Sequence, residues 1–249
     1  MAGVSQGART GHQAHQAAAQ RPAPPGPGGL RRLSRHASGR VGRSRHDVPD
    51  FDLSVYRGKG VFATFRETVL PELAEQVRAS DATVLRCWSA GCVSGEEAYT
   101  VQLLWRLCLA ERFPDIQLEI MATDADPHLI ERARQGRYSR GSLKDLPPRW
   151  LEVGFERCGD DFVVRDTFRE GIRFAAQDIR CEFPAGPFHL VLCRNLVFTY
   201  FADPVQRAVL TRIATRLAPG GILLVGRHEA LPSEHPDWVP DADRQGFFH

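Results

Sequence analysis

The sequence predicts an α/β fold built on a mostly parallel β-sheet, with a small antiparallel β insertion. Three observations lead to this prediction. Short apolar runs alternate with longer segments of helical period from about residue 83 onward. The run Phe188–Cys193 is apolar at nearly every position, as a strand covered on both faces requires. The alternation stops after Gly136 and resumes at Ile172, with a stretch of no helical period in between.

The first half of the alternation contains two expected strands and three expected helices. Apolar residues recur every three to four positions along Phe62–Val77 and again along Glu96–Phe113. Asp126 is suited to cap a third helix, with Pro127 at its first position and Gly136 just beyond its end. The expected strands between these helices are Thr83–Trp88 and Gln117–Thr123.

The second half contains the insertion and the remaining strands. Residues 137–171 include a turn at Gly159–Asp161 followed by the apolar Phe162–Val164, which is typical of an antiparallel excursion. A further helix is expected from Asp203, as its cap, to Leu217 on its apolar face. The other expected strands are Ile172–Ala176, Phe188–Cys193, Ile222–Val225 and Gly246–Phe248.

Charge is divided unevenly along the 249 residues. Residues 1–46 contain eight Arg and no acidic residue, so they carry +8, while residues 47–249 carry −6. The N-terminal segment is rich in Pro, Gly and Ala, so we expect residues 1–46 to be a disordered tail and residues 47–249 to form the folded domain. The acidic domain argues against nucleic acid as a partner. A tail without a role is favoured over a basic arm that contacts acidic partners, and a downstream translation start is a third alternative.

Cysteine spacing and apolar runs restrict the class of protein further. The six cysteines show no C-x-x-C spacing, and no Cys/His cluster has the spacing of a zinc site. We therefore expect buried free thiols, no metal and a reduced compartment. No apolar run approaches the ~18 residues of a membrane-spanning helix, and no signal peptide is evident. These features predict a monomer in the cytoplasm with no membrane insertion.

The turn after the first expected strand is the first candidate site. In parallel sheets, ligands bind at the carboxyl ends of the strands. Gly91 and Gly95 lie in this turn and let a ligand approach the backbone. Glu96 and Glu97 then open the next helix, where they would repel a pyrophosphate and suit a cationic ligand without phosphate, such as S-adenosylmethionine. A purely structural role is the alternative, because acids at a helix start stabilise it by ~0.3–1 kcal/mol each.

Polar residues also follow the later strands. Asp124 can accept the two ribose hydroxyls of an adenosine, or be a surface acid. Asp178 lies where an adenine amino group would be, and Asn195 where a transferred group would be. His228 and Glu229 are either an acid/base pair or ordinary turn polarity. The patterns of serine hydrolases, zinc peptidases and P-loop proteins are absent.

Six segments of the chain carry a family resemblance. They are W-S-A-G-C-V-S-G-E-E-A-Y-T (88–100), A-T-D-A-D (122–126), E-R-A-R-Q-G-R-Y (131–138), L-K-D-L-P-P-R-W (143–150), G-P-F-H-L-V-L-C-R-N (186–195) and L-A-P-G-G-I-L-L-V-G (217–226). They resemble the CheR-type methyltransferases, which methylate glutamate side chains of bacterial chemoreceptors. The resemblance implies a class I S-adenosylmethionine-dependent methyltransferase fold with a Rossmann-like sheet. It also implies S-adenosylhomocysteine as a product and a chemoreceptor cytoplasmic region as the protein substrate.

The resemblance implies roles for individual residues around the cofactor. Glu96 or Glu97 would contact its methionine part, and Asp124 its ribose. Asp178 and Ile179 would flank the adenine. The full set implied in cofactor binding is Gly91, Glu96, Glu97, Asp124, Asp178, Ile179, Asn195 and Leu196.

The resemblance also implies catalytic residues. Asn195 and Leu196 would line the methyl-transfer end, and Asn195 and Tyr200 are implied as catalytic residues. The arginine that clamps the substrate carboxylate would be Arg66, in T-F-R, with Arg57, in V-Y-R, as the competing match. Residues 137–171 occupy the place of an insertion that some members use to dock the receptor.

The chain departs from the family pattern in three ways. The N-terminal helical domain of the family is not evident, and neither are the asparagine and threonine that precede its arginine. The segment between C-R-N and Tyr200-Phe201 is one residue longer than usual. Two alternatives follow: the same cofactor with a different protein or small-molecule acceptor, or a non-catalytic regulatory module that binds the cofactor.

Overall fold

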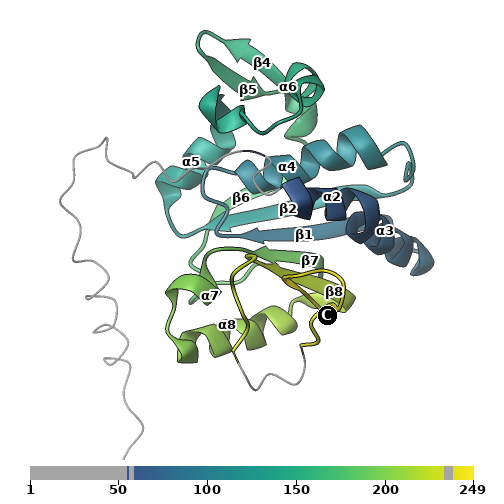
Figure 1. The fold of residues 1–249 in the computed structure, drawn as a ribbon, viewed down its shortest axis with the longest axis vertical. Helices are drawn as coiled ribbons and strands as arrows, with labels where there is room; N and C mark the ends of the chain where they lie inside the picture. Colours follow the sequence, from purple (N-terminus) through teal and green to yellow (C-terminus); the bar gives the residue numbers. More distant parts are fainter. Residues whose placement is uncertain (1–54, 56–58, 233–237) are drawn as a thin grey trace, which may run out of the picture. The chain divides into compact units, whose positions relative to one another are not determined.

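The computed structural model describes residues 55, 59–232 and 238–249 (Figure 1). The predicted tail, residues 1–46, and Arg57 lie outside the described residues, so the domain boundary after residue 46 stays a prediction. Among the described residues, no helix is both long and apolar enough to cross a membrane.

A six-stranded sheet forms the centre of the described part (Figure 1). Its strands are β1 (Val84–Ala90), β2 (Gln117–Asp124), β6 (Ile172–Ala176), β7 (Phe188–Cys193), β8 (Leu217–Val225) and β9 (Phe247–Phe248). Their order is β6-β2-β1-β7-β8-β9. The first five are parallel to their neighbours and β9 is antiparallel to β8. The five parallel strands therefore end at one edge, and β1 lies where the strand order reverses.

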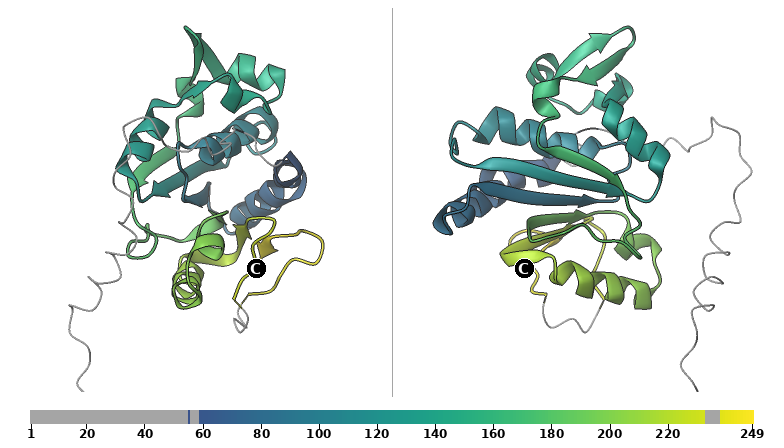
Figure 2. Two further views of the ribbon diagram at one scale, coloured as in Figure 1. Left: turned by 60° about the vertical axis from the view of Figure 1, so that its left-hand side comes forward. Right: turned by 180° about the vertical axis from the view of Figure 1, so that it is seen from behind.

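Helices cover both faces of this sheet (Figures 1 and 2). Inward side chains of one face, such as Cys87 and Leu192, belong to the core under the first set of helices. Trp88 and Val191 point to the opposite face and pack with the second set. The first set is α2 (Lys59–Thr64), the π-helix η1 (Phe65–Val69), α3 (Leu70–Ala79), α4 (Glu96–Leu104), the π-helix η2 (Trp105–Leu109) and α5 (Pro127–Gln135); the second is α7 (Val197–Tyr200) and α8 (Asp203–Ala214).

The insertion forms a separate three-stranded antiparallel sheet, as the sequence predicts. Its order is β3 (Arg137–Ser139), β5 (Asp161–Val164) and β4 (Phe155–Cys158), with α6 (Pro148–Gly154) beside it. The Tyr138 hydroxyl donates to the backbone oxygen of Ser94 at 2.6 Å, so this small sheet is tied directly to the turn after β1. Short 3-10 turns, η3 (Gly141–Leu143) and η4 (Asp166–Phe168), complete the insertion.

Several element boundaries differ from the prediction. The Asp126 side chain accepts from the His128 N–H at 2.8 Å and caps α5, as predicted. Asp203 is instead the first residue of α8, where it pairs with Arg207. The predicted extension of α8 to Leu217 is wrong, because the helix ends at Ala214 and Leu217 already pairs in the sheet. Leu217 fits the apolar spacing of the helix only by chance, because its backbone pairs with β7 in the sheet.

The cysteines are free, and the prediction that they are buried is confirmed for half of them. Cys87, Cys92 and Cys193 are buried. The other three, Cys108, Cys158 and Cys181, are exposed. The first three lie on or directly after central strands, whereas the exposed ones lie on the outer elements and loops.

Candidate functional site

The turn after β1 is packed against the end of β2. The backbone N–H groups of Gly91 and Cys92 both donate to the Thr123 oxygen, at 2.8 and 3.0 Å. Gly91 has φ +75°, and a Cβ there would lie 2.6 Å from Leu196 Cδ2. Glycine is therefore required at position 91 both for its backbone angle and for the close approach of Leu196. This places the turn after β1 against the segment that follows β7.

Asp124 ends β2 and holds this turn in place. Its Oδ2 accepts the backbone N–H of Val93 at 3.0 Å, and its Oδ1 accepts that of Asp126 at 3.0 Å. Val93 has φ +50°, an unusual angle for a β-branched residue that the hydrogen bond helps to maintain. The Asp124 backbone oxygen accepts the N–H of Gln177, which brings the segment after β6 to the same place.

Glu97 lies between the ends of β1 and β7. Its Oε1 accepts the Ser89 hydroxyl at 3.0 Å, and its Oε2 pairs with Arg194 Nη1 at 2.9 Å. The two paired side chains are only 16% and 19% exposed. Arg194 Nε is buried without a hydrogen-bond partner among the described residues, and the guanidinium lies 5.8 Å from the ring centre of Phe62. A carboxylate and a guanidinium thus share a partly enclosed position at the strand edge.

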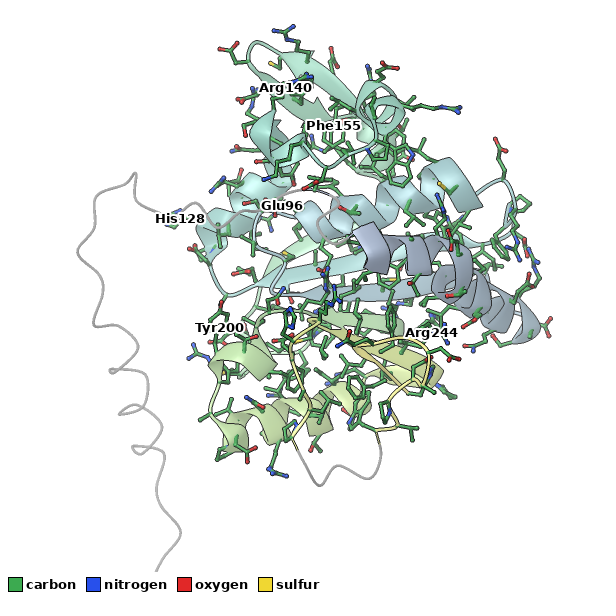
Figure 3. All side chains as sticks on the ribbon, in the orientation of Figure 1. Glu96, His128, Arg140, Phe155, Tyr200 and Arg244 are labelled. Atoms are coloured by element: carbon green, nitrogen blue, oxygen red, sulfur yellow. The ribbon has the colours of Figure 1, made fainter. Side chains whose placement is uncertain are left out.

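Glu96 has a different environment from its neighbour. It is 9% exposed, at the start of α4 and below the insertion that carries the labelled Arg140 and Phe155 (Figure 3). Burial raises the pKa of Glu96 to about 7, an effect that the positive charge of Arg132 partly offsets. The helix start therefore presents one carboxylate to the strand edge and buries the other.

The segment after β6 carries Asp178 and Ile179. Ile179 is buried in the same cluster as Ala90, the last residue of β1. The Asp178 carboxylate is bound by the Arg180 guanidinium and backbone N–H, and this interaction holds the pKa of Asp178 below its usual value. Ile179 is therefore a buried residue of the segment after β6, whereas Asp178 is engaged by its own neighbour.

The segment after β7 is held by Glu229. Asn195 has φ +53°, and its backbone N–H donates to Glu229 Oε2 at 2.8 Å. The same oxygen accepts the Gly226 N–H at 2.6 Å, and Oε1 accepts the Thr199 hydroxyl at 2.5 Å. The short helix α7 ends at Tyr200, whose side chain is 67% exposed (Figure 3).

The structure does not bring Arg66 to this edge. Arg66 lies on η1, is 47% exposed and pairs with Glu67 at 2.5 Å. Its positive charge opposes the effect of burial, which raises the pKa of the Cys108 thiol on η2. Arg66 is therefore near η2, which follows the C-terminal end of α4, whereas the strand-end group lies at the N-terminal end of α4. The competing match, Arg57, lies outside the described residues.

The strand ends thus bring together a connected group of side chains. The group contains Gly91, Glu97, Asp124, Ile179, Asn195 and Leu196. Residues 53–247 match the family described as "CheR methyltransferase, SAM binding domain". The chain belongs to this family.

Curated relatives agree with this membership. A chemotaxis protein methyltransferase of Listeria monocytogenes is 30% identical over 178 residues, which are 72% of this chain and 64% of that protein. A probable chemotaxis protein methyltransferase of Rhizobium etli is 31% identical over 184 residues, 72% of this chain and 67% of that protein. A Rhodobacter capsulatus protein described as an uncharacterized 104.1 kDa protein in the hypE 3' region is 35% identical over 187 residues, 74% of this chain and 19% of that protein.

This chain spans 19% of the Rhodobacter capsulatus protein and slightly less than two thirds of the Listeria monocytogenes one. The CheR family and the sheet order together confirm the predicted class I S-adenosylmethionine-dependent methyltransferase fold. They also account for the small antiparallel sheet that interrupts the alternation in this CheR chain.

Two residues at the strand edge make contacts that the sequence pattern did not indicate. Arg194 follows β7 in the C-R-N segment, but its pairing with Glu97 joins positions that are far apart in the chain. The sequence indicates Glu229 only as half of an acid/base pair or as turn polarity, because its three donors come from the segment after β7, from α7 and from its own turn. A carboxylate shortly after a strand end is a sequence signal for such contacts. The same position also fits an acid/base residue or ordinary turn polarity.

Proposed function

We propose that this CheR-family protein transfers a methyl group from S-adenosylmethionine to a glutamate carboxylate of a protein, with a chemoreceptor cytoplasmic region as the substrate class. The products are a glutamate methyl ester and S-adenosylhomocysteine. The single observation that carries the proposal is the convergence of Asp124 and Glu97 on the turn at Gly91. We place the reaction in the cytoplasm and expect a monomer.

The charged residues at the strand edge fit this cofactor. The N-terminus of α4 carries Glu96 and Glu97 where a phosphate-binding helix would keep its backbone N–H groups free. A negative helix start disfavours nucleotides with phosphate groups and suits a ligand with positive charge. S-adenosylmethionine supplies an electrophilic methyl group on a positively charged sulfur. The residues present therefore match the charge of the group that the family binds.

Asp124 is the residue that we assign to the ribose hydroxyls. Its two oxygens are fixed by the N–H groups of Val93 and Asp126, and each carboxylate oxygen keeps a further lone pair for a hydroxyl donor. Ile179 would contact one face of the adenine, because it belongs to the segment after β6 that the Gln177 N–H joins to Asp124. Asp178 would reach the adenine only alongside its contact with Arg180.

Between the two glutamates, Glu97 is the better candidate for the ammonium group of the cofactor. It lies between β1 and β7 at the strand edge, whereas Glu96 is buried near Arg132. The Ser89 hydroxyl and Arg194 hold the Glu97 carboxylate in one orientation. Glu96 then stabilises the turn and the base of the small sheet instead of contacting ligand.

The chemical step makes few demands on acid/base groups. A substrate carboxylate is already ionised at neutral pH, so the chain needs no general base. Its residues contribute by position and by exclusion of water. Asn195 and Leu196 would border the reacting carboxylate, and Tyr200 would close the site from α7. The clamping arginine is assigned to Arg57 in preference to Arg66, because Arg66 lies at the far end of α4–η2.

Calorimetric titration of the full chain with S-adenosylhomocysteine, followed by transfer of labelled methyl to a receptor fragment, tests the proposal. We expect binding by the wild type, loss of affinity in Asp124→Ala, and base-labile methanol released from the labelled receptor. Absence of binding by a folded wild-type sample would contradict the cofactor assignment. Binding without transfer to receptor glutamates would contradict the substrate assignment.

The second candidate function also binds S-adenosylmethionine, but with a different methyl acceptor or without catalysis. The solvent-exposed Tyr200 and the longer segment that leads to it favour a different acceptor or a non-catalytic, cofactor-binding module. Labelled methyl appearing in another protein or a small molecule identifies the first of these. Binding with no single-turnover transfer to any acceptor identifies the second.

A further inference from the structure

The carboxylate of Glu229 joins three parts of the strand edge. Its Oε2 accepts two backbone N–H groups, from Asn195 after β7 and from Gly226 after β8. Its Oε1 accepts the Thr199 hydroxyl on α7. A carboxylate with three short donors forms charge-assisted hydrogen bonds, which are stronger than neutral ones. Glu229 therefore links the ends of two parallel strands to the helix that carries Tyr200.

The surroundings of Gly226 show how closely these groups are packed. A Cβ at position 226 would lie 2.7 Å from Asn195 Oδ1 and 2.7 Å from Glu229 Oε2. No side chain larger than hydrogen fits there without displacing one of them. Asn195 meanwhile adopts φ +53°, a left-handed backbone angle that asparagine tolerates better than most non-glycine residues. The Glu229 contact is the interaction that fixes its N–H.

We propose that Glu229 is a positioning residue of the methyl-transfer site, which acts by holding the Asn195 backbone and α7 rather than by acid/base chemistry. The statement that Glu229 acts in a methyl-transfer site rests on the proposed function. The hydrogen-bond geometry itself does not depend on that function. The three donors to Glu229 come from Asn195, Gly226 and Thr199, and no hydrogen bond joins its carboxylate to the His228 ring among the described residues.

A graded set of substitutions separates geometry from charge. In Glu229→Gln, the amide oxygen can accept both backbone N–H groups and the amide NH₂ can donate to the Thr199 hydroxyl, so all three contacts can persist. Glu229→Ala removes all three. Thr199→Val removes only the contact to α7. Glu75→Gln on α3, where the side chain is half exposed, is the matched control.

The first measurement is hydrogen exchange of single backbone amides by NMR on the unliganded full chain. We expect the Asn195 and Gly226 amides to exchange at least about tenfold faster in Glu229→Ala than in the wild type, and to stay protected in Glu229→Gln. The Val93 amide, bound by Asp124, is an internal reference that should not change. Unchanged exchange at Asn195 and Gly226 in Glu229→Ala would overturn the proposal.

The second measurement is affinity for S-adenosylhomocysteine together with steady-state kinetics. Glu229→Ala should weaken binding about tenfold, while Glu229→Gln stays within about twofold of the wild type. Thr199→Val should lower kcat with little change in the cofactor KM, because it releases only α7. Equal losses in Glu229→Gln and Glu229→Ala would show that charge, not position, matters and would overturn the proposal.

Gly226→Ala covers the case in which Glu229→Ala does not fold. Its added Cβ pushes against Asn195 and Glu229 without removing a polar group, so exchange at the Asn195 amide should again rise. Gly60→Ala, with open space around the new Cβ, is its control. If the wild type binds no S-adenosylhomocysteine while the exchange results hold, the proposed function fails and the positioning role of Glu229 stands. Normal exchange in Gly226→Ala would contradict the role.

Discussion

Glu97 and Arg194 form an ion pair, with 2.9 Å between Oε2 and Nη1, that joins the first turn of α4 to the end of β7. Glu97 follows β1 and Arg194 follows β7, and these two strands are neighbours where the strand order reverses. The Ser89 hydroxyl of β1 donates to the other carboxylate oxygen of Glu97, Oε1. The pair orients a carboxylate toward the strand edge before any ligand arrives, which reduces the ordering that binding must supply.

A double-mutant cycle should detect this ion pair. Because both side chains are mostly enclosed, Glu97→Gln and Arg194→Met should show a coupling free energy of about 1 kcal/mol in urea unfolding. The solvent-exposed pair of Arg78 and Asp115 serves as the comparison and should couple more weakly. Additive effects at Glu97 and Arg194 would show that the contact contributes nothing to stability.

Asp124→Ala should weaken S-adenosylhomocysteine binding at least about tenfold, because it removes the ribose acceptor and the anchor of Val93. Asp124→Asn keeps one acceptor oxygen and should lose less. Asp126→Ala is the matched control, since this cap should cost about 1 kcal/mol of stability and leave affinity unchanged. Calorimetry and urea unfolding measure the two effects. Equal affinities in all three variants would exclude Asp124 from the site.

Glu96→Gln should stabilise the protein at pH 8 and have little effect at pH 5. Burial raises the pKa of Glu96 to about 7, so the folded state retains a proton that the unfolded chain has lost. The contribution of this group to stability therefore falls as pH rises from about 4.5 to about 7, by up to about 3 kcal/mol. Urea unfolding at the two pH values, with the exposed Glu152→Gln as control, measures the difference. A gain that is equal at pH 5 and pH 8 would disprove a raised pKa.

Arg66→Ala should leave both kcat and KM close to the wild-type values, because Arg66 pairs with Glu67 far from the strand edge. Arg57→Ala should lower turnover by roughly 100-fold if Arg57 positions the substrate carboxylate. Initial rates of labelled methyl transfer distinguish the two. The reverse result, with Arg66→Ala inactive, would identify Arg66 as the arginine that clamps the substrate carboxylate.

The candidate site could be predicted in part because its residues are marked by local sequence. Gly91 and Asp124 stand directly after strands whose apolar pattern is clear, and parallel strands bring their ends to one edge. Asp126 and Gly136 could be placed at the two ends of α5 for the same reason, since caps depend on a few neighbouring residues. The choice between Arg57, in V-Y-R, and Arg66, in T-F-R, stays a prediction, because two short matches carry no information on distance from the edge.

The sequence by itself determined the fold class, the antiparallel insertion and the strand ends at which polar residues gather, because the periods of strands and helices and the preferences of caps are local. Only the tertiary structure decided which of two adjacent glutamates faces the edge. Glu96 and Glu97 differ by about 100° around α4, so the elements packed on each side assign one to the interior and the other to Arg194. The contacts of Glu229 were decided in the same way, because its partners at Asn195 and Thr199 are brought to it by the parallel pairing of β7 and β8.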